Sequence, residues 1–351
     1  MSALVQEHPG NEPVPAGEAA RLFAGLADEA RLLVAVSGGP DSVALLALLS
    51  EWARRPGRPA LYAATVDHGL REASAAEAEA VAALCRKLDV PHAILRWSGP
   101  KPASGIQERA RKARYSLLAQ HALSLGGAVL VTAHTLDDQA ETMLMRMARG
   151  SGPAGLVGMR ARVRKGAVEL ARPLLGLTKA RLIATAERHG LSVIQDPSNA
   201  DARFERVRWR GLLPLLAEEG LSSERLATLA SRLARLEAAL AHRVVSLLPG
   251  LRPSGAGDNL QLDLAALADE PEEIVLRLIA RGLETVAGTE GRNLPRLERL
   301  EACAGALIAA AGRGAAMTRT LSGCVLALDR KGVLTLSREP LRRRGIHSAA
   351  R

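Results

Sequence analysis

A short run of small and acidic residues offers the clearest chemistry in the sequence. It reads Ser37-Gly38-Gly39-Pro40-Asp41-Ser42 and follows an apolar stretch. Glycines leave backbone N–H groups uncovered, and a helix that begins within the run adds the positive end of its dipole, so the turn can hold an anion such as phosphate. A purely structural turn is the competing interpretation, because glycine and aspartate are common at helix ends.

A second group of candidates consists of His134 and three acidic residues, Asp137, Asp138 and Glu141. On a helix, residues three and four positions apart share a face, so Glu141 can converge with either aspartate. Paired carboxylates suit a cation, either an ammonium group or a metal ion. Acidic residues also stabilise the first turn of a helix without any function. These acids, however, follow an apolar run, and open α/β sheets bind ligands at the carboxyl ends of their strands.

The elements that must position these groups alternate along the first part of the chain. Short β-like apolar runs occupy residues 32–36, 61–66, 92–97 and 128–132, and helical stretches occupy 18–28, 42–53, 73–88, 107–124, 137–149 and 178–189. Such alternation is typical of parallel strands joined by crossover helices. The sequence therefore predicts an α/β fold with an open parallel sheet and helices on both faces.

The chain changes character after Leu221. Leucine and valine recur there at steps of three and four residues as far as Leu247, which predicts a long amphipathic helix. Further helices are predicted at 271–286 and 295–311, followed by a small hairpin around a Lys-Gly turn. We therefore expect a lead-in at 1–30, an α/β domain at 31–215, a mainly helical domain at 221–315, and a hairpin with a basic tail at 316–351.

Composition and charge narrow the class of protein. Hydrophobic residues make up 48% of the chain and charged residues 24%, as in ordinary globular proteins. The formal net charge of +10 suits either a polyanionic partner or an anionic membrane surface, and the charge alone does not distinguish them. No apolar run is long enough to cross a membrane, no secretory signal is visible, and the three cysteines form no CxxC pair. We expect a cytoplasmic protein with reduced thiols and no membrane partner, and a homodimer is compatible with the sequence.

Glycine motifs elsewhere point away from two common nucleotide sites. The chain has no Gly-Lys dipeptide and so no Walker A loop, and its GxGxxG match at Gly150, Gly152 and Gly155 follows a predicted helix instead of a strand. The run from Ser37 to Ser42 instead resembles the SGGxDS signature of the PP-loop ATP pyrophosphatase superfamily. The resemblance implies that ATP is cleaved between its α- and β-phosphates, with AMP transferred to a second substrate and Mg²⁺ bridging the phosphates.

Further matches narrow the resemblance to one family. In chain order they are VDHGLR (66–71), QERARKARY (107–115), TAHTLDDQAET (132–142), RGSG (149–152), RPLL (172–175) and DPSN (196–199). Together they resemble the tRNA(Ile)-lysidine synthase family, which implies that 31–215 is a PP-loop ATP-binding catalytic domain and 221–315 a tRNA-contacting domain. The resemblance implies that ATP adenylates the wobble cytidine of tRNA(Ile) with a CAU anticodon, and that free L-lysine then attacks to give lysidine, AMP and pyrophosphate. Codon reading changes from AUG to AUA, and tRNA identity from methionine to isoleucine.

The resemblance also implies roles for individual residues. Those assigned to nucleotide binding are Ser37, Gly38, Gly39, Pro40, Asp41, Ser42, Asp67, His68 and Arg111. Those assigned to catalysis are Asp41, Arg114, His134, Asp138 and Glu141. Asp138 and Glu141 would hold the substrate lysine, and Asp41 and Asp137 would contact Mg²⁺. Because carboxylates favour the charged form of lysine whereas a nucleophile must be neutral, we expect the ammonium to bind first and to lose its proton as it attacks.

Basic residues cluster in three segments. The first two suit a tRNA backbone: they hold the arginines predicted to contact tRNA, Arg160, Arg162, Arg164, Arg203, Arg206, Arg208 and Arg210, and the first also holds Lys165. Phosphate contacts of this kind make binding strongly dependent on salt. The third cluster, Arg342–Arg344, is better explained as a solvated tail. One departure from the family is Arg206-Val207, where its members commonly have an Arg-Asn pair.

Related activities fit the sequence less well. A tRNA 2-thiolase would need nearby cysteines for sulfur transfer, and an amidotransferase-type synthetase would need an ammonia-generating Cys/His arrangement. A non-catalytic RNA-binding protein would have no need for the glycine run and the acidic residues together. Release of pyrophosphate that depends on both lysine and tRNA would separate these alternatives.

Overall fold

The computed structural model describes residues 11–99, 105–194, 201, 203–254, 259–288 and 295–340. The chain forms two compact units: the first extends to Ser231, apart from Ser151–Ala154, and the second begins at Arg232. Two segments named above, DPSN (196–199) and Arg342–Arg344, lie outside the described residues. Among the helices that the structure describes, none combines the length and the apolar character needed to span a membrane.

A six-stranded sheet forms the centre of the first unit, with the strand order β3-β2-β1-β4-β6-β5. Its strands are β1 (Arg31–Ala35), β2 (Ala60–Asp67), β3 (His92–Arg96), β4 (Val129–Val131), β5 (Arg162–Lys165) and β6 (Val168–Ala171). All neighbouring strands are parallel except β5, which pairs antiparallel with β6. The predicted open, mainly parallel α/β sheet is therefore confirmed.

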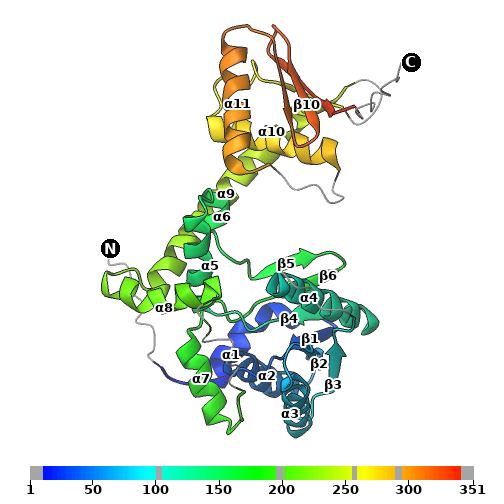
Figure 1. Cartoon of the computed structure of the whole chain (residues 1–351), viewed down its shortest axis with the longest axis vertical. Coiled ribbons are helices and arrows are strands. Elements are labelled where there is room, and N and C mark those ends of the chain that lie inside the picture. The colour runs from blue at the N-terminus through cyan, green and yellow to red at the C-terminus, as the bar shows by residue number, and fades with distance from the viewer. Residues whose placement is uncertain are drawn as a thin grey trace, which may run out of the picture. The chain divides into compact units, whose positions relative to one another are not determined.

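Helices cover both faces of this sheet (Figure 1). In chain order, the helices as far as residue 218 are α1 (Ala16–Leu22), α2 (Pro40–Ala53), α3 (Ser74–Lys87), α4 (Ile106–Ser124), α5 (Leu136–Ala148), α6 (Pro153–Leu156), α7 (Lys179–Arg188) and α8 (Glu205–Glu218), with a 3-10 turn at Ala24–Leu26. Leu32 and Val34 of β1 face the core shared with α1, α2 and α7, whereas Leu33 faces the core shared with α4. A strand buried on both faces explains the continuous apolar run in its sequence.

The position of β1 determines where a ligand site can form. The chain passes from β1 through α2 to β2 on one side, while β4 pairs with the other side of β1. In this register Val34 pairs with Val131, so the loops that follow β1 and β4 emerge side by side at the carboxyl edge. Open α/β sheets bind ligands at such a change of direction.

Some elements of the first unit were not predicted from the sequence. β5 is a short edge strand whose residues are mostly exposed and charged, so it has no apolar alternation to detect. β6 has only four residues. α8 contains Pro214 and a single buried residue, Leu213, which leaves its apolar periodicity weak.

The second unit packs helices against a smaller antiparallel sheet. Its elements are the end of α9 (Ser223–Leu247), a 3-10 turn (Leu248–Gly250), β7 (Arg252–Pro253), β8 (Leu260–Asp263), α10 (Glu272–Ala287), α11 (Leu297–Gly312), β9 (Met317–Leu321), β10 (Cys324–Leu328) and β11 (Val333–Arg338). The strand order is β7-β8-β11-β10-β9. The predicted hairpin is confirmed as β10 and β11, whereas β7, β8 and β9 were not predicted.

Candidate active site

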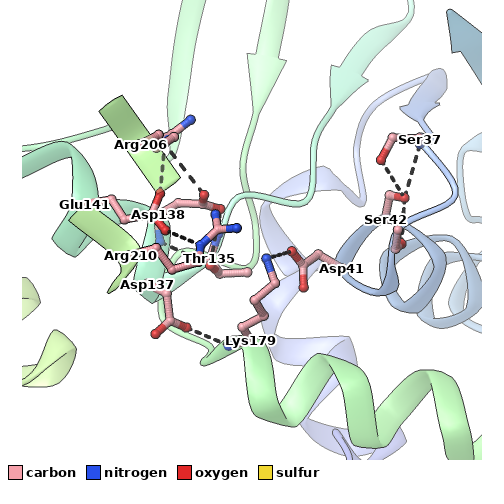
Figure 2. Close-up of polar contacts among 11 residues, drawn as sticks. Ser37, Asp41, Ser42, Thr135, Asp137, Asp138, Glu141, Lys179, Arg206 and Arg210 are labelled. Carbon is pink, nitrogen blue, oxygen red and sulfur yellow. Dashed lines mark hydrogen bonds and ion pairs between the residues drawn. The ribbon is translucent and has the colours of Figure 1, made fainter. Parts of the chain in front are cut away.

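The glycine run after β1 is held in shape by Ser42. The Ser42 hydroxyl donates to the Gly39 carbonyl oxygen at 2.9 Å and accepts the Ser37 N–H at 3.1 Å, and the two serine hydroxyls lie 3.3 Å apart (Figure 2). α2 begins at Pro40, a residue suited to the first helical position, where no N–H is needed. The positive end of α2 therefore opens onto a loop of defined shape, as an anion site requires.

Gly38 cannot be replaced without strain. Its φ of +84° lies in the left-handed region, and its carbonyl oxygen accepts the Ile194 N–H at 2.8 Å. A Cβ on Gly38 would lie 2.5 Å from Cδ1 of Ile194 and 3.2 Å from Cγ2 of Val81. The conformation and the space both require glycine. The back of the loop thus rests on Ile194 and Val81.

Asp41 lies in the first turn of α2, beside the glycine run. Its Oδ2 atom is 3.0 Å from Nζ of Lys179, the first residue of α7 (Figure 2). Its Oδ1 atom is buried and has no hydrogen-bond partner among the described residues. Burial raises the pKa of the Asp41 carboxyl, although Lys179 acts in the opposite direction. One carboxylate oxygen is therefore available to a further cation.

The donor set suits Mg²⁺, which proteins usually bind through one or two carboxylates together with substrate phosphates and water. Asp41 Oδ1 is such an oxygen, next to a predicted phosphate loop. Asp137 is placed differently, because its Oδ2 accepts the Lys179 N–H at 2.7 Å and its Oδ1 accepts the Ser223 hydroxyl at 3.2 Å. Of the two predicted metal contacts, Asp41 has the free oxygen, whereas Asp137 joins α5 to the starts of α7 and α9.

Asp138 caps the start of α5. Its Oδ2 accepts the Thr135 N–H at 2.9 Å, while the Thr135 hydroxyl accepts the Asp138 N–H at 3.2 Å, which is a capping box. Oδ1 lies 3.9 Å from Nη2 of Arg206. Burial raises the pKa of the Asp138 carboxyl, but Arg206, the Thr135 N–H and His134 outweigh it and lower the pKa below its ordinary value. Asp138 therefore carries a charge at neutral pH.

Glu141 is enclosed one turn further along α5. Its side chain is 1% exposed, and its oxygens lie 2.9 Å from Nε of Arg206 and 2.8 Å from Nε of Arg210 (Figure 2). Both arginines come from α8, and Arg206 also donates to the Thr142 hydroxyl at 3.2 Å. A ligand ammonium could contact Glu141 only after an arginine had moved away.

His134 lies between β4 and α5. Its Nδ1 atom is 2.9 Å from the Thr132 hydroxyl oxygen. Burial lowers the pKa of His134 to about 4; Asp138 opposes this shift, whereas Arg172, Arg206 and Arg111 reinforce it. His134 is thus neutral at physiological pH and can exchange hydrogen bonds without carrying charge.

The residues predicted after β2 have local partners. Asp67 Oδ1 accepts the Ser74 hydroxyl at 2.7 Å and the Gly69 N–H at 2.9 Å. The Ser74 hydrogen bond, followed by that from Gly69, lowers the pKa of Asp67 against the effect of burial. His68 lies edge-on to Trp97, with ring centroids 6.1 Å apart. Both residues lie at the carboxyl end of β2, next to β1.

The arginines predicted to contact tRNA fall into two groups. Arg162 pairs with Glu29 and Glu169, Arg203 with Asp201, and Arg206 and Arg210 with Glu141, as the ion pairs within the described residues show. Arg208 donates to the Arg203 carbonyl oxygen at 3.0 Å. Arg160 and Arg164 are exposed on and beside β5. Much of the predicted basic charge is therefore already balanced by carboxylates.

Two contacts of the site were missed by sequence reasoning. Lys179 lies between Asp41 and Asp137, and a lysine in the first turn of a helix is disfavoured by the helix dipole, which is the signal that could have identified it. Ile194 supports Gly38 through its backbone and side chain, and no feature of a lone isoleucine reveals such a contact.

Comparisons with known proteins agree with this geometry. Residues 15–216 match the family model of the PP-loop domain. A tRNA(Ile)-lysidine synthase of Methylobacterium nodulans is 51% identical over 316 residues, which cover 90% of this chain and 92% of that relative. Another, from a Bradyrhizobium species, is 47% identical over 348 residues and covers 95% and 97%.

A solved structure shows the same fold at low identity. The U34-tRNA thiolase NcsA from Methanococcus maripaludis has a TM-score of 0.53 and 18% identity, with 62% of this chain and 78% of that chain covered. At such identity the likeness concerns the fold alone. The sequence matches, which extend over most of the chain, show the family instead. This chain belongs to the PP-loop proteins and, among them, to the tRNA(Ile)-lysidine synthases.

Proposed function

We propose that this chain converts the wobble cytidine of tRNA(Ile) with a CAU anticodon to lysidine. Cytosine O2 attacks the α-phosphorus of ATP and pyrophosphate leaves; the ε-amino group of L-lysine then attacks C2, the C2–O bond breaks, and AMP leaves. The observation that carries the proposal is the meeting of the Ser37–Ser42 loop with Asp138 at adjacent strand ends, in a chain 51% identical to a tRNA(Ile)-lysidine synthase.

The nucleotide half of the proposed reaction rests on the loop and Asp41. Backbone N–H groups at the start of α2 would hold the phosphates, and Lys179 would balance charge that develops on the leaving pyrophosphate. Asp41 Oδ1 would hold Mg²⁺. When bound, the metal ion neutralises phosphate charge.

The lysine half rests on Asp138 more than on Glu141. Asp138 keeps a low pKa and has an oxygen, Oδ1, without a close partner, so it suits recognition of an ammonium group. A carboxylate with a low pKa is a weak base, so we assign the proton released on attack to water instead. Glu141 would hold Arg206 and Arg210 beside the site and join the lysine contact if they moved.

The test is mass spectrometry of the anticodon nucleoside after incubation with tRNA transcript, ATP and L-lysine. A mass gain that corresponds to lysine at the wobble cytidine is expected. Omission of lysine should stop this gain, and Asp41→Asn should reduce it together with pyrophosphate release. Pyrophosphate release that needs tRNA but no lysine, or no change in the nucleoside, would contradict the proposal.

A thiolase is not favoured by these findings. The relatives that match most of the chain are tRNA(Ile)-lysidine synthases, and the likeness to a thiolase is one of fold. The three cysteines, Cys85, Cys303 and Cys324, are buried, and burial raises the pKa of Cys85 to about 12, which disfavours a reactive thiolate. The same mass measurement distinguishes a sulfur atom from a lysine.

A further inference from the structure

Four cations surround the ring of Tyr115, which is 6% exposed. Nζ of Lys165 lies 3.6 Å from the ring centroid, and the guanidinium carbons of Arg111 and Arg114 lie 5.4 Å and 5.6 Å from it. The Arg172 guanidinium interacts with the Tyr115 side chain. These residues come from α4, the end of β5 and the residue after β6. We call Arg111, Arg114, Lys165 and Arg172, with Tyr115, the Tyr115 cluster.

Carboxylates do not balance this cluster. In the part of the chain that the structure describes, none of its four cations forms an ion pair with Asp or Glu, and Arg172 Nε is buried without a hydrogen-bond partner. Burial lowers the pKa of Arg114, Lys165 and Arg172, Tyr115 opposes the shift, and the charge on Arg111 lowers each pKa further. Gathering these cations costs free energy that a bound anion would recover.

Other arginines of the first unit differ from the Tyr115 cluster because glutamates balance their charge. Arg162, Arg206 and Arg210 were predicted to contact RNA, but each is already paired with glutamate. In the Tyr115 cluster, by contrast, Arg111 and Lys165 are exposed, and Arg114 and Arg172 are half-buried. A large anion can therefore approach the charge that remains unbalanced.

The position of the cluster indicates which anion it fits. Arg172 follows Ala171 of β6, which pairs with Val131 of β4 and accepts the Thr132 N–H at 3.0 Å, so the cluster borders the segment that carries His134. The phosphates of ATP already have the loop at the start of α2, which lies after β1. Several cations spread over three elements match the spaced charges of a nucleic-acid backbone, and arginine suits phosphate contacts.

We propose that the Tyr115 cluster binds a phosphodiester group of the tRNA beside the target cytidine, with Arg172 as a contact not predicted from the sequence. This inference rests on the proposed function, because it takes the tRNA as the macromolecular substrate. The shared chemistry is phosphate, so the ATP triphosphate is the alternative source. The two sources differ in which ligand loses affinity when the cluster is altered.

The test measures binding of a fluorescent anticodon stem-loop to the full chain by anisotropy, over a series of salt concentrations. We expect Lys165→Gln and Arg172→Gln each to weaken binding about tenfold and to reduce the slope of log K against log salt by about one. Lys165→Arg should restore affinity because it keeps the charge. Lys112→Gln makes the same change at an exposed position on α4 outside the cluster, and it should leave the slope unchanged.

A second ligand separates the two sources of phosphate. Binding of a non-hydrolysable ATP analogue, measured by calorimetry, should be equal for the wild type, Lys165→Gln and Arg172→Gln. If the variants weaken only the analogue, or if they match Lys112→Gln with RNA, the inference is wrong. Because Lys165 is exposed, its substitution tests the inference even if Arg172→Gln fails to fold.

The experiment also distinguishes this inference from the proposed function. If wild-type protein bound the stem-loop through these residues but formed no lysidine, RNA binding by the cluster would be supported and the proposed reaction would be contradicted. If lysidine formed while the variants kept full RNA affinity and salt dependence, the proposed reaction would be supported and the RNA-binding role of the cluster would be contradicted.

Discussion

The nucleotide half and the carboxylate half of the site differ in what they leave available. Around Ser37–Ser42, the Ser42 hydroxyl holds the loop in shape, and Asp41 has a buried oxygen with no hydrogen-bond partner among the described residues. Around α5, Glu141 is already balanced by Arg206 and Arg210. The comparison teaches that ligand binding completes the first half, whereas the second half is also part of the structural framework. Substitutions should therefore affect activity in one half and stability in the other.

The largest effect is expected at Gly38. Alanine there would add left-handed strain of about 1–2 kcal/mol and overpacking of about 1–3 kcal/mol against Ile194 and Val81. If the loop bears this cost, kcat/KM for ATP falls by roughly 30- to 5000-fold. Pyrophosphate release measures it. Gly57→Ala is the matched control, because Gly57 has a φ of +74° but open space around its Cβ position. Equal activity in the two variants would remove the role given to the Ile194 contact.

Glu141→Gln tests the carboxylate half. It would leave Arg206 and Arg210 without their counter-charge, and we expect the free energy of unfolding to fall by about 3 kcal/mol, at the lower end for a buried pair because both arginines are partly exposed. Urea unfolding measures the change. Glu205→Gln alters an exposed pair with Arg149 and should cost less than about 1 kcal/mol. Similar costs for the two variants would contradict a structural role for Glu141.

The dependence of stability on pH should trace to His134. Burial holds its pKa at about 4, below the ordinary value of 6.5. As the pH falls from 6.5 to 5, the unfolded chain binds a proton that the folded chain does not, so the free energy of unfolding falls by roughly 2 kcal/mol; above pH 6.5 the residue contributes no slope. His134→Gln should flatten this part of the curve. An unchanged curve in that variant would assign the slope to other groups.

The smallest effect is expected for Asp138→Asn. The amide oxygen can still accept the Thr135 N–H, so the helix cap should survive, while the loss of charge should raise KM for lysine about tenfold. KM for ATP is the internal control and should stay the same. A change in both KM values, or in KM for ATP alone, would contradict the role of Asp138 in recognition of lysine.

Much of the fold could be predicted because the first unit repeats strong local signals. The four strands β1 to β4 have apolar runs, and the glycine run comes directly after the central strand. β5 and α8 escaped prediction because an exposed charged edge and a helix with one buried residue have little periodicity. The failure to predict α8 mattered most for the site, because α8 brings Arg206 and Arg210 to Glu141, and these ion pairs were therefore missed.

The site residues show the same division. Ser42 and Asp138 are bonded to neighbours three to five positions away, so their surroundings follow from local sequence. Lys179 meets Asp41 across the fold, and Lys165 meets Tyr115 only after β5 pairs with β6. Such pairings depend on topology that no local pattern contains. The clustering of positive charge along the sequence also predicted that Arg162, Arg206 and Arg210 contact RNA. In the folded chain, these arginines form ion pairs with glutamates.

The Gly38–Ile194 hydrogen bond sets a lower limit on the length of a working fragment. The glycine run and its following helix form a compact motif in the sequence, yet the loop closes against a residue encoded more than 150 positions later. A truncated chain that stops before Ile194 should keep the motif but lose the conformation that grips a nucleotide. For the same reason, the run placed in another protein should not adopt this conformation unless a residue equivalent to Ile194 is included to support it.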